Sequence, residues 1–160
     1  MPKKKKAVAR ATRAKPAARA KPARAKRADR ARPETFRART LAASLTVNDL
    51  QKSLAWYRDV VGFTVDREHA RDGTLRAVSL KAGTVRILLA QDDGAKGFDR
   101  VKGEGFSLQF TTAQDVDDVA STIKERGGTL LTEPADMHGA RAFRLQDPDG
   151  FRLVISSERQ

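Results

Sequence analysis

Histidine and cysteine, which serve often as metal ligands and in proton transfer or nucleophilic attack, are sparse in this chain of 160 residues, which has two histidines and no cysteine. The absence of cysteine excludes disulfides and thiol nucleophiles. The sequence offers neither a nucleophile–base pair nor two carboxylates at a spacing suited to acid–base catalysis, so we assign no catalytic residue. The candidates for a metal site are Glu68, His69, Glu104, Gln109 and His138.

Two of these candidates do not act together. Glu68 and His69 are neighbours on an expected strand, so their side chains point to opposite faces. His138 lies in an expected loop beside Asp136, from which it can reach a neighbouring cleft. A metal site built from the five candidates is therefore an alternative and not the first expectation.

The segment 141–155, RAFRLQDPDGFRLVI, predicts two strands joined by a tight turn. Phe143 and Leu145 alternate with polar or small residues, which is the period of a half-buried strand. The turn is DPDG at 147–150, where proline presets one backbone dihedral and glycine accepts a positive φ. The apolar run 151–155 predicts the second strand.

An earlier segment, 73–90, repeats this pattern. Its two strand-like runs flank Gly83 as the later runs flank Gly150, and the correspondence extends back to 44–45 against 107–108. The offset between matching positions drifts from 63 to 67 residues (107 − 44 and 150 − 83), which is longer than solenoid repeats. We therefore expect two similar modules that share one core.

The first module, about 40–91, is expected to begin with a strand at 41–47 and a helix. Asn48 is the expected N-cap of this helix, Gln51 is its capping-box partner, and Gly62 ends it. Asp72-Gly73 predicts a hairpin turn. The further strands are expected at 63–70, 75–80 and 84–90.

The second module, about 104–157, follows a polar, glycine-rich linker at 92–103. Asp115 is the expected N-cap of its helix, which ends at Gly127-Gly128. Its strands are expected at 106–111, at 129–132 and in the hairpin at 141–155. The predicted fold class is α+β, with two βαβββ modules that form curved mixed sheets around a cleft.

Charge divides the chain into a basic tail, 1–34, and a domain, 35–160. Residues 1–33 hold 14 Lys and Arg and one acid. Residues 34–160 hold the other 18 Lys and Arg and 19 Asp and Glu, so they are nearly neutral. The tail has too few large apolar side chains to offset the entropy of ordering, so we expect disorder. Spaced cations without acids suit a phosphate backbone, and the tail resembles those of histone-H1-like proteins. No apolar run approaches the ~18 residues of a membrane span.

The domain resembles the glyoxalase/bleomycin-resistance/dioxygenase superfamily, also called vicinal oxygen chelate proteins, over residues of about 40–157. The matching motifs are Val47-Asn48-Asp49-Leu50, Trp56-Tyr57, Val60-Val61-Gly62-Phe63, Gly127-Gly128, His138-Gly139-Ala140-Arg141 and Asp147-Pro148-Asp149-Gly150. The paired βαβββ architecture of this family agrees with the elements expected from the residue patterns.

Enzymes of this family hold one divalent metal ion with His, Gln or Glu on facing strands, and the metal polarises a substrate that has two neighbouring oxygens. The resemblance places the four ligand positions at Ala42, near Ile87, within 106–108 and at Val154. None of these side chains binds such a metal. We therefore expect neither a metal ion nor a cofactor.

The resemblance then implies an apolar cleft with a few polar groups, as small-molecule sites usually have. Arg152 is expected at one end of the cleft, and His138 and Arg141 at its mouth. The expected ligand-binding residues are Ala42, Ser44, Ile87, Leu89, Phe106, Leu108, His138, Arg141, Arg152 and Val154.

The first functional expectation is a metal-free protein that binds a small organic molecule, similar to the bleomycin-resistance branch. We expect a homodimer in the cytoplasm, located at the nucleoid if residues 1–33 contact nucleic acid non-specifically, and no membrane partner. Two alternatives stay open. One is a metal-dependent glyoxalase-type lyase or dioxygenase with unusual ligands, and the other is a structural or interaction module whose cleft is filled.

Overall fold

The structure is a computed structural model that describes residues 38–158, so the expected basic tail lies outside the described residues. The first module comprises β1 (Ala42–Val47), α1 (Leu50–Ala55), the π-helical segment η1 (Trp56–Val61), β2 (Thr64–Arg71), β3 (Thr74–Ala82) and β4 (Val85–Gln91). The second comprises β5 (Ser107–Thr112), α2 (Val116–Glu125), β6 (Leu130–Met137), β7 (Ala140–Gln146) and β8 (Arg152–Ser157). The two predicted βαβββ modules are confirmed.

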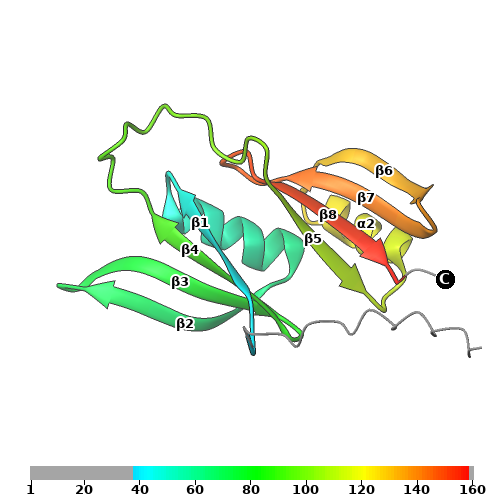
Figure 1. The fold of residues 1–160 in the computed structure, drawn as a ribbon, viewed down its shortest axis with the longest axis horizontal. Coiled ribbons are helices and arrows are strands. Elements are labelled where there is room, and N and C mark those ends of the chain that lie inside the picture. The colour runs from blue at the N-terminus through cyan, green and yellow to red at the C-terminus, as the bar shows by residue number, and fades with distance from the viewer. Residues whose placement is uncertain (1–37, 159–160) are drawn as a thin grey trace, which may run out of the picture. The chain divides into compact units, whose positions relative to one another are not determined.

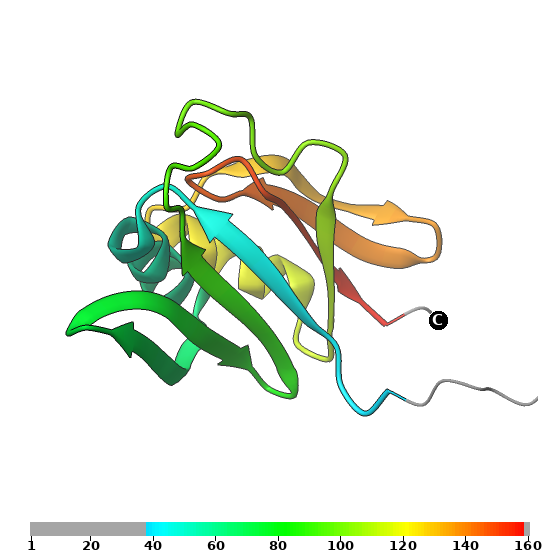
Figure 2. The same ribbon diagram turned by 60° about the vertical axis from the view of Figure 1, so that its left-hand side comes forward.

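Each module forms a mixed four-stranded sheet, in the orders β1-β4-β3-β2 and β5-β8-β7-β6. The pairs β1/β4 and β5/β8 are parallel, and the other pairs are antiparallel. Both helices lie behind the sheets in Figure 1, and Figure 2 shows them from the side. Each sheet therefore has a helix-covered face and a helix-free face, which we call the open face. The predicted α+β class is confirmed.

The core lies on the helix-covered faces, because alternate strand residues point there. Leu45, Val78 and Leu89 of the first sheet are buried in one cluster with Phe143 and Leu153 of the second. The rings of Phe63 and Phe110 meet edge to face at 5.8 Å and join the two modules. No helix within residues 38–158 is long and apolar enough to cross a membrane.

The first helix is capped one residue later than predicted. Asp49 is the N-cap, and its side chain accepts a hydrogen bond from the Lys52 N–H. The predicted capping box is also wrong, because the Asn48 backbone N–H donates to Asp149 of the second module at 2.7 Å and not to Gln51. At the other end, Gly62 has a φ of 98° and terminates the helix as predicted.

Strand β6 runs five residues beyond its predicted end at 132, through Met137. Pro134 made a strand improbable from the sequence, because proline has no N–H for a sheet ladder. However, β6 is the outer strand of its sheet, and Pro134 lies at a shift in its pairing with β7. Proline is tolerated at such edge and bulge positions.

The DPDG turn at 147–150 joins the second module to the first helix. The Tyr57 hydroxyl donates to the Asp147 carboxylate at 2.9 Å, and these two residues are only 0 % and 5 % exposed. Ser53 donates to Asp149 at 2.8 Å. Burial, together with the Asp147 charge, raises the pKa of Tyr57, and burial also raises the pKa of Asp147. The hydrogen bond thus satisfies a carboxylate that has lost most of its water.

A second buried charge cluster holds the linker between β4 and β5. Asp92 accepts hydrogen bonds from Lys102 at 2.6 Å and from Arg100 at 2.9 Å. These donors, with the Gly94 N–H, hold the pKa of Asp92 well below its usual range. The linker also packs directly on the DPDG turn, since a Cβ on Gly103 would lie 2.5 Å from the Gly150 carbonyl oxygen.

Removal of the hydroxyl in Tyr57→Phe is expected to lower the free energy of unfolding by about 1–3 kcal/mol, because it leaves the buried Asp147 carboxylate without this donor. Urea denaturation of the wild type, Tyr57→Phe, Asp147→Asn and the double variant measures the coupling. A coupling energy near zero would show that the two side chains do not stabilise the fold together.

Asp92 is expected to make stability depend on pH. Because its pKa is lower in the folded state, it stabilises the fold above the ordinary Asp pKa of about 4 and loses this effect as the pH falls further. The difference in unfolding free energy between wild type and Asp92→Asn should therefore shrink between about pH 4 and pH 3. Asp99→Asn, in the same linker and exposed, is the control. A difference that stays constant over this range would contradict the assignment.

Candidate functional site

The open face of the second sheet carries polar and small side chains in aligned rows. Gln109 on β5 is opposite Val154 on β8, which is opposite Arg144 on β7. In the next row Thr111, Ser156 and Ala142 correspond in the same way. Neighbouring strands are about 4.8 Å apart, so each row spans roughly 10 Å of sheet surface.

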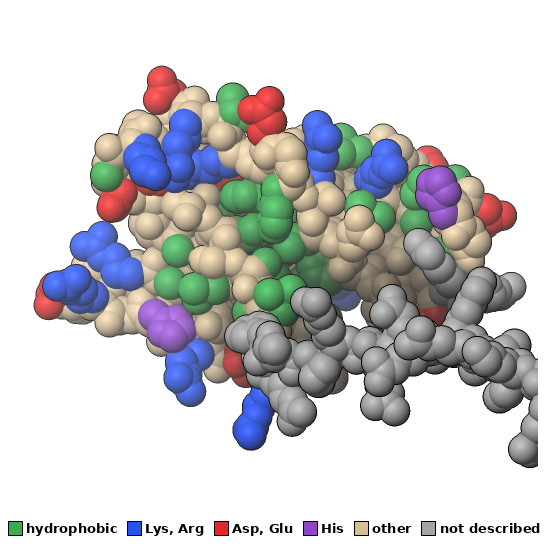
Figure 3. All heavy atoms as spheres, viewed as in Figure 1, with side chains coloured by type: hydrophobic (Ala, Val, Ile, Leu, Met, Phe, Trp, Pro, Cys, Tyr) green, Lys and Arg blue, Asp and Glu red, His purple; other side chains and the backbone are tan. Residues whose placement is uncertain are grey.

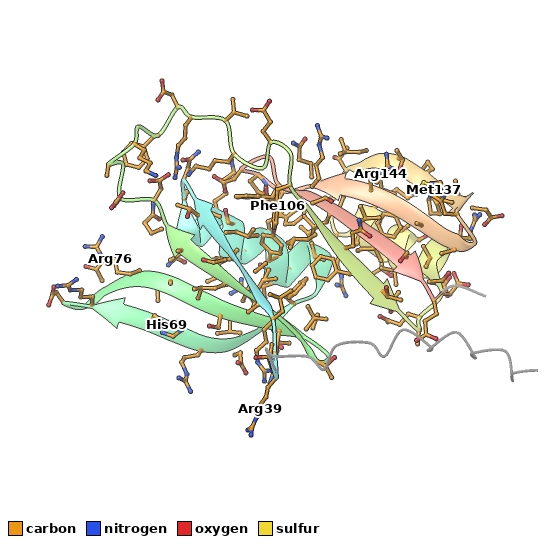
Figure 4. All side chains as sticks on the ribbon, viewed as in Figure 1. Arg39, His69, Arg76, Phe106, Met137 and Arg144 are labelled. Carbon is orange, nitrogen blue, oxygen red and sulfur yellow. The ribbon has the colours of Figure 1, made fainter. Side chains whose placement is uncertain are left out.

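These rows form the floor of a hollow of about 380 Å³. It is bounded on one side by the β6–β7 turn, where His138 and Gly139 both have positive φ angles of 51° and 82°. Figure 4 shows Arg144 and Met137 over this sheet. The lining residues are Gln109, Thr111, Met137, His138, Ala140, Ala142, Arg144, Val154, Ser156 and Ser157.

Several polar groups in the hollow are not used by the fold. Within residues 38–158, the Arg144 guanidinium, the Gln109 amide and the Thr111 hydroxyl make no hydrogen bond to another side chain or to the backbone. By contrast, the Ser157 hydroxyl accepts from the Arg141 N–H and donates to a backbone carbonyl. The free groups lie beside Val154 and Ala142, so the hollow combines unused donors with an apolar floor.

Some predicted cleft residues lie on the open faces. Ala42 and Ser44 project from the open face of the first sheet, and Arg152 and Val154 from that of the second. Phe106, 44 % exposed, precedes β5 and meets the Phe151 ring at a centroid distance of 6.3 Å. Of the predicted ligand-binding residues, Val154 and His138 line the hollow.

Three predicted cleft residues face the core instead. Ile87 and Leu89 are 2 % and 0 % exposed, and Leu108 packs against the same core cluster. The prediction was one residue out of register on β4 and β5, so the open face of β4 presents Leu88 between Arg86 and Ala90.

Arg141 also lies outside the hollow. Its guanidinium forms ion pairs with Asp117 of α2 and Asp136 of β6. These hydrogen bonds raise the pKa of Arg141 further above its usual value. Arg141 therefore ties the helix to the sheet edge, and Arg144, three residues later on the other face, is the arginine of the hollow.

The donor set does not fit the metal ion that this architecture implies. Among residues 38–158, no three His, Cys, Asp or Glu side chains lie close enough to share an ion. In Figure 3 the two histidines appear as separate purple groups at opposite ends of the face shown. Of the five candidate ligands, Gln109 and His138 line the hollow, while Glu68, His69 and Glu104 do not.

Sequence analysis missed a contact between His69 and Ser79, whose Nε2 and Oγ atoms are 3.1 Å apart. His69 is paired with Ala77, and Arg67 with Ser79, so His69 and Ser79 are diagonal neighbours on one face of the two strands. Within the described chain, no third group hydrogen-bonds to His69 to orient it as a base, so the pair lacks the arrangement of an activated nucleophile.

Comparison with known proteins shows similarity to several enzymes and binding proteins. The chain is 28% identical over 122 residues to a probable lactoylglutathione lyase of Synechocystis, covering 72% of this chain and 92% of that one. It is 28% identical over 112 residues to the glutathione transferase FosA of Serratia marcescens, covering 70% and 75%. The structure of TnmS3, an antibiotic binding protein from Streptomyces, aligns with a TM-score of 0.63 at 19% identity, covering 78% and 98%.

The two relatives are named for different activities, so they do not indicate one activity for this chain. The likeness to TnmS3, at 19% identity, shows the fold alone. A family model, however, matches almost the whole domain, residues 39–155. This match agrees with the paired βαβββ modules and their helix-free faces. The chain therefore belongs to the Glyoxalase/Bleomycin resistance protein/Dioxygenase superfamily.

Proposed function

We propose that the protein binds a small organic molecule on the open face of the second sheet, without a metal ion. The observation that carries this proposal is the hollow of about 380 Å³, in which unused polar groups surround an apolar floor. Small-molecule sites bring apolar surface and polar side chains together, and the polar side chains fix the orientation of the ligand. The ligand is held by side chains of the protein itself.

The lyase or dioxygenase alternative needs a metal ion or an activated acid–base pair. The four ligand positions implied by the family fall on side chains such as Ala42 and Val154, which donate nothing to a metal. The filled-cleft alternative needs side chains packed over the open face, whereas Gln109, Thr111 and Arg144 leave a hollow there. Binding therefore has more support than either alternative.

A bulky residue at the floor of the hollow is expected to abolish binding. Small molecules that raise the melting temperature of the full-length protein should lose this effect in Val154→Trp, because the indole fills the space between the Gln109 and Arg144 side chains. Leu88→Trp, on the open face of β4 in the first sheet, is the matched control. The same screen after treatment with a chelator distinguishes metal-free binding from the metal-dependent alternative.

Loss of every thermal shift on chelation would favour a metal-dependent protein over the proposed function. Shifts that persist in Val154→Trp and disappear in Leu88→Trp would place the ligand on the open face of the first sheet.

We also propose that two copies associate, as expected from the family resemblance. The open face of the first sheet carries the apolar Leu88, and Phe106 is exposed, so a second copy could cover these two side chains. Sedimentation velocity over a range of protein concentrations measures this association, and a single monomeric species throughout would refute it.

The tail is proposed to hold the protein near nucleic acid. This proposal rests on composition alone, since residues 1–33 hold 14 Lys and Arg and one acid. Fluorescence anisotropy with labelled duplex DNA should show binding by the full chain that weakens steeply with salt, because binding releases counterions from the phosphates. Equal binding by residues 35–160 alone would refute a role for the tail.

A further inference from the structure

The hollow on the second sheet contains no negative charge. None of its lining residues among 38–158 is Asp or Glu, although residues 34–160 hold 19 acids against 18 Lys and Arg. The composition of the domain therefore does not explain the absence of carboxylates from this surface. Arg144 gives the hollow a permanent positive charge, because a guanidinium stays protonated in proteins.

Arg144 differs from Arg141 in having no acid beside it. Arg141 is neutralised by Asp117 and Asp136 on the helix side of the sheet. No ion pair of Arg144 exists among the described residues. Its only hydrogen bond there that involves a side chain runs from its backbone N–H to the Thr132 hydroxyl, at 3.0 Å. That bond fixes the main chain at Arg144 while its guanidinium stays available.

A second donor lies across the hollow from Arg144. Val154 stands between Arg144 and Gln109 in the same row of the sheet, so both long side chains can converge above it. A guanidinium binds two oxygens of a carboxylate or of a phosphate-type group through parallel N–H groups. The Gln109 amide can donate to the same group from the opposite side, and Thr111 lies in the next row.

We infer that the ligand of this hollow carries an oxyanion headgroup, a carboxylate or a phosphonate, bound by Arg144 with Gln109 as second donor. The apolar body of the ligand then lies over Val154, Ala142 and Met137. This inference rests on the proposed function and specifies the chemical class of the ligand. It requires no metal ion, because the positive charge comes from the arginine.

Three probes with the same ring test the inference: benzoate, phenylphosphonate and the uncharged benzamide. They are titrated at low salt into the ¹⁵N-labelled full-length protein, with amide chemical shifts as the readout. We expect the two anions to shift amides of β5, β7 and β8 saturably and benzamide to bind about tenfold more weakly, since a charge-assisted hydrogen bond contributes about 1.5–3 kcal/mol. The ratio of the two anion affinities identifies the preferred headgroup.

Arg144→Gln is the decisive variant, and Arg67→Gln is its matched control. Arg67 is an exposed arginine of the first sheet, also without an ion pair among the described residues, and both variants keep the basic tail. We expect Arg144→Gln to weaken anion binding about tenfold and to leave benzamide binding unchanged. Arg67→Gln should bind like the wild type. If Arg144→Gln disturbs the spectrum of the free protein, Gln109→Leu replaces it, with a smaller expected loss for the anions.

Each other outcome overturns the inference. Equal affinities for benzoate and benzamide in the hollow would refute an anionic ligand while leaving the proposed function intact. Anion binding that survives in Arg144→Gln would place the anion elsewhere, for example on the tail. If none of the three probes shifts β5, β7 or β8 saturably, both the inference and the proposed function fail.

Discussion

The buried hydrogen bond between Tyr57 and Asp147 is the constraint on which the arrangement of the two modules depends. A carboxylate with so little contact with water needs a donor, and the first helix supplies it from the other half of the domain. The same turn receives Ser53 through Asp149 and packs against the linker at Gly103. Strands β7 and β8, which carry half of the hollow, are joined by this turn, so the contact that holds the modules together also supports the site.

Most of the fold could be predicted because short-range patterns determine it. Alternation predicted the strands, and glycine and aspartate predicted the ends of the helices. The partner of the Asn48 N–H could not be found in this way, because Asp149 lies 101 residues away. The full length of β6 was missed for a related reason, since only the sheet order shows that the strand with Pro134 is an edge.

The site was predicted less well than the fold, because the sequence does not show to which of the two faces of a sheet each strand residue points. In Ile87-Leu88-Leu89 three apolar residues follow one another, so the sequence does not show which of them face the core. The choice was made from the resemblance and was one residue out of register. The same problem applies to the arginines of β7. From the sequence, Arg141 and Arg144 are equally suited to the mouth of a cleft, but in the structure they lie on opposite faces of the strand. The charge of the hollow depends on which arginine lacks an acid, and the sequence does not contain that information directly.

The outer edges of the two sheets limit how this domain can self-associate. The strand β6 at one edge contains Pro134, which cannot donate to an added strand, and carries Glu133 and Asp136. At the other edge, β2 is exposed along its whole length and carries Asp66, Arg67, Glu68 and Arg71. Proline and charged side chains of this kind oppose the strand-by-strand growth that leads to fibrils. The outer edges at β2 and β6 therefore disfavour the addition of a strand from another copy.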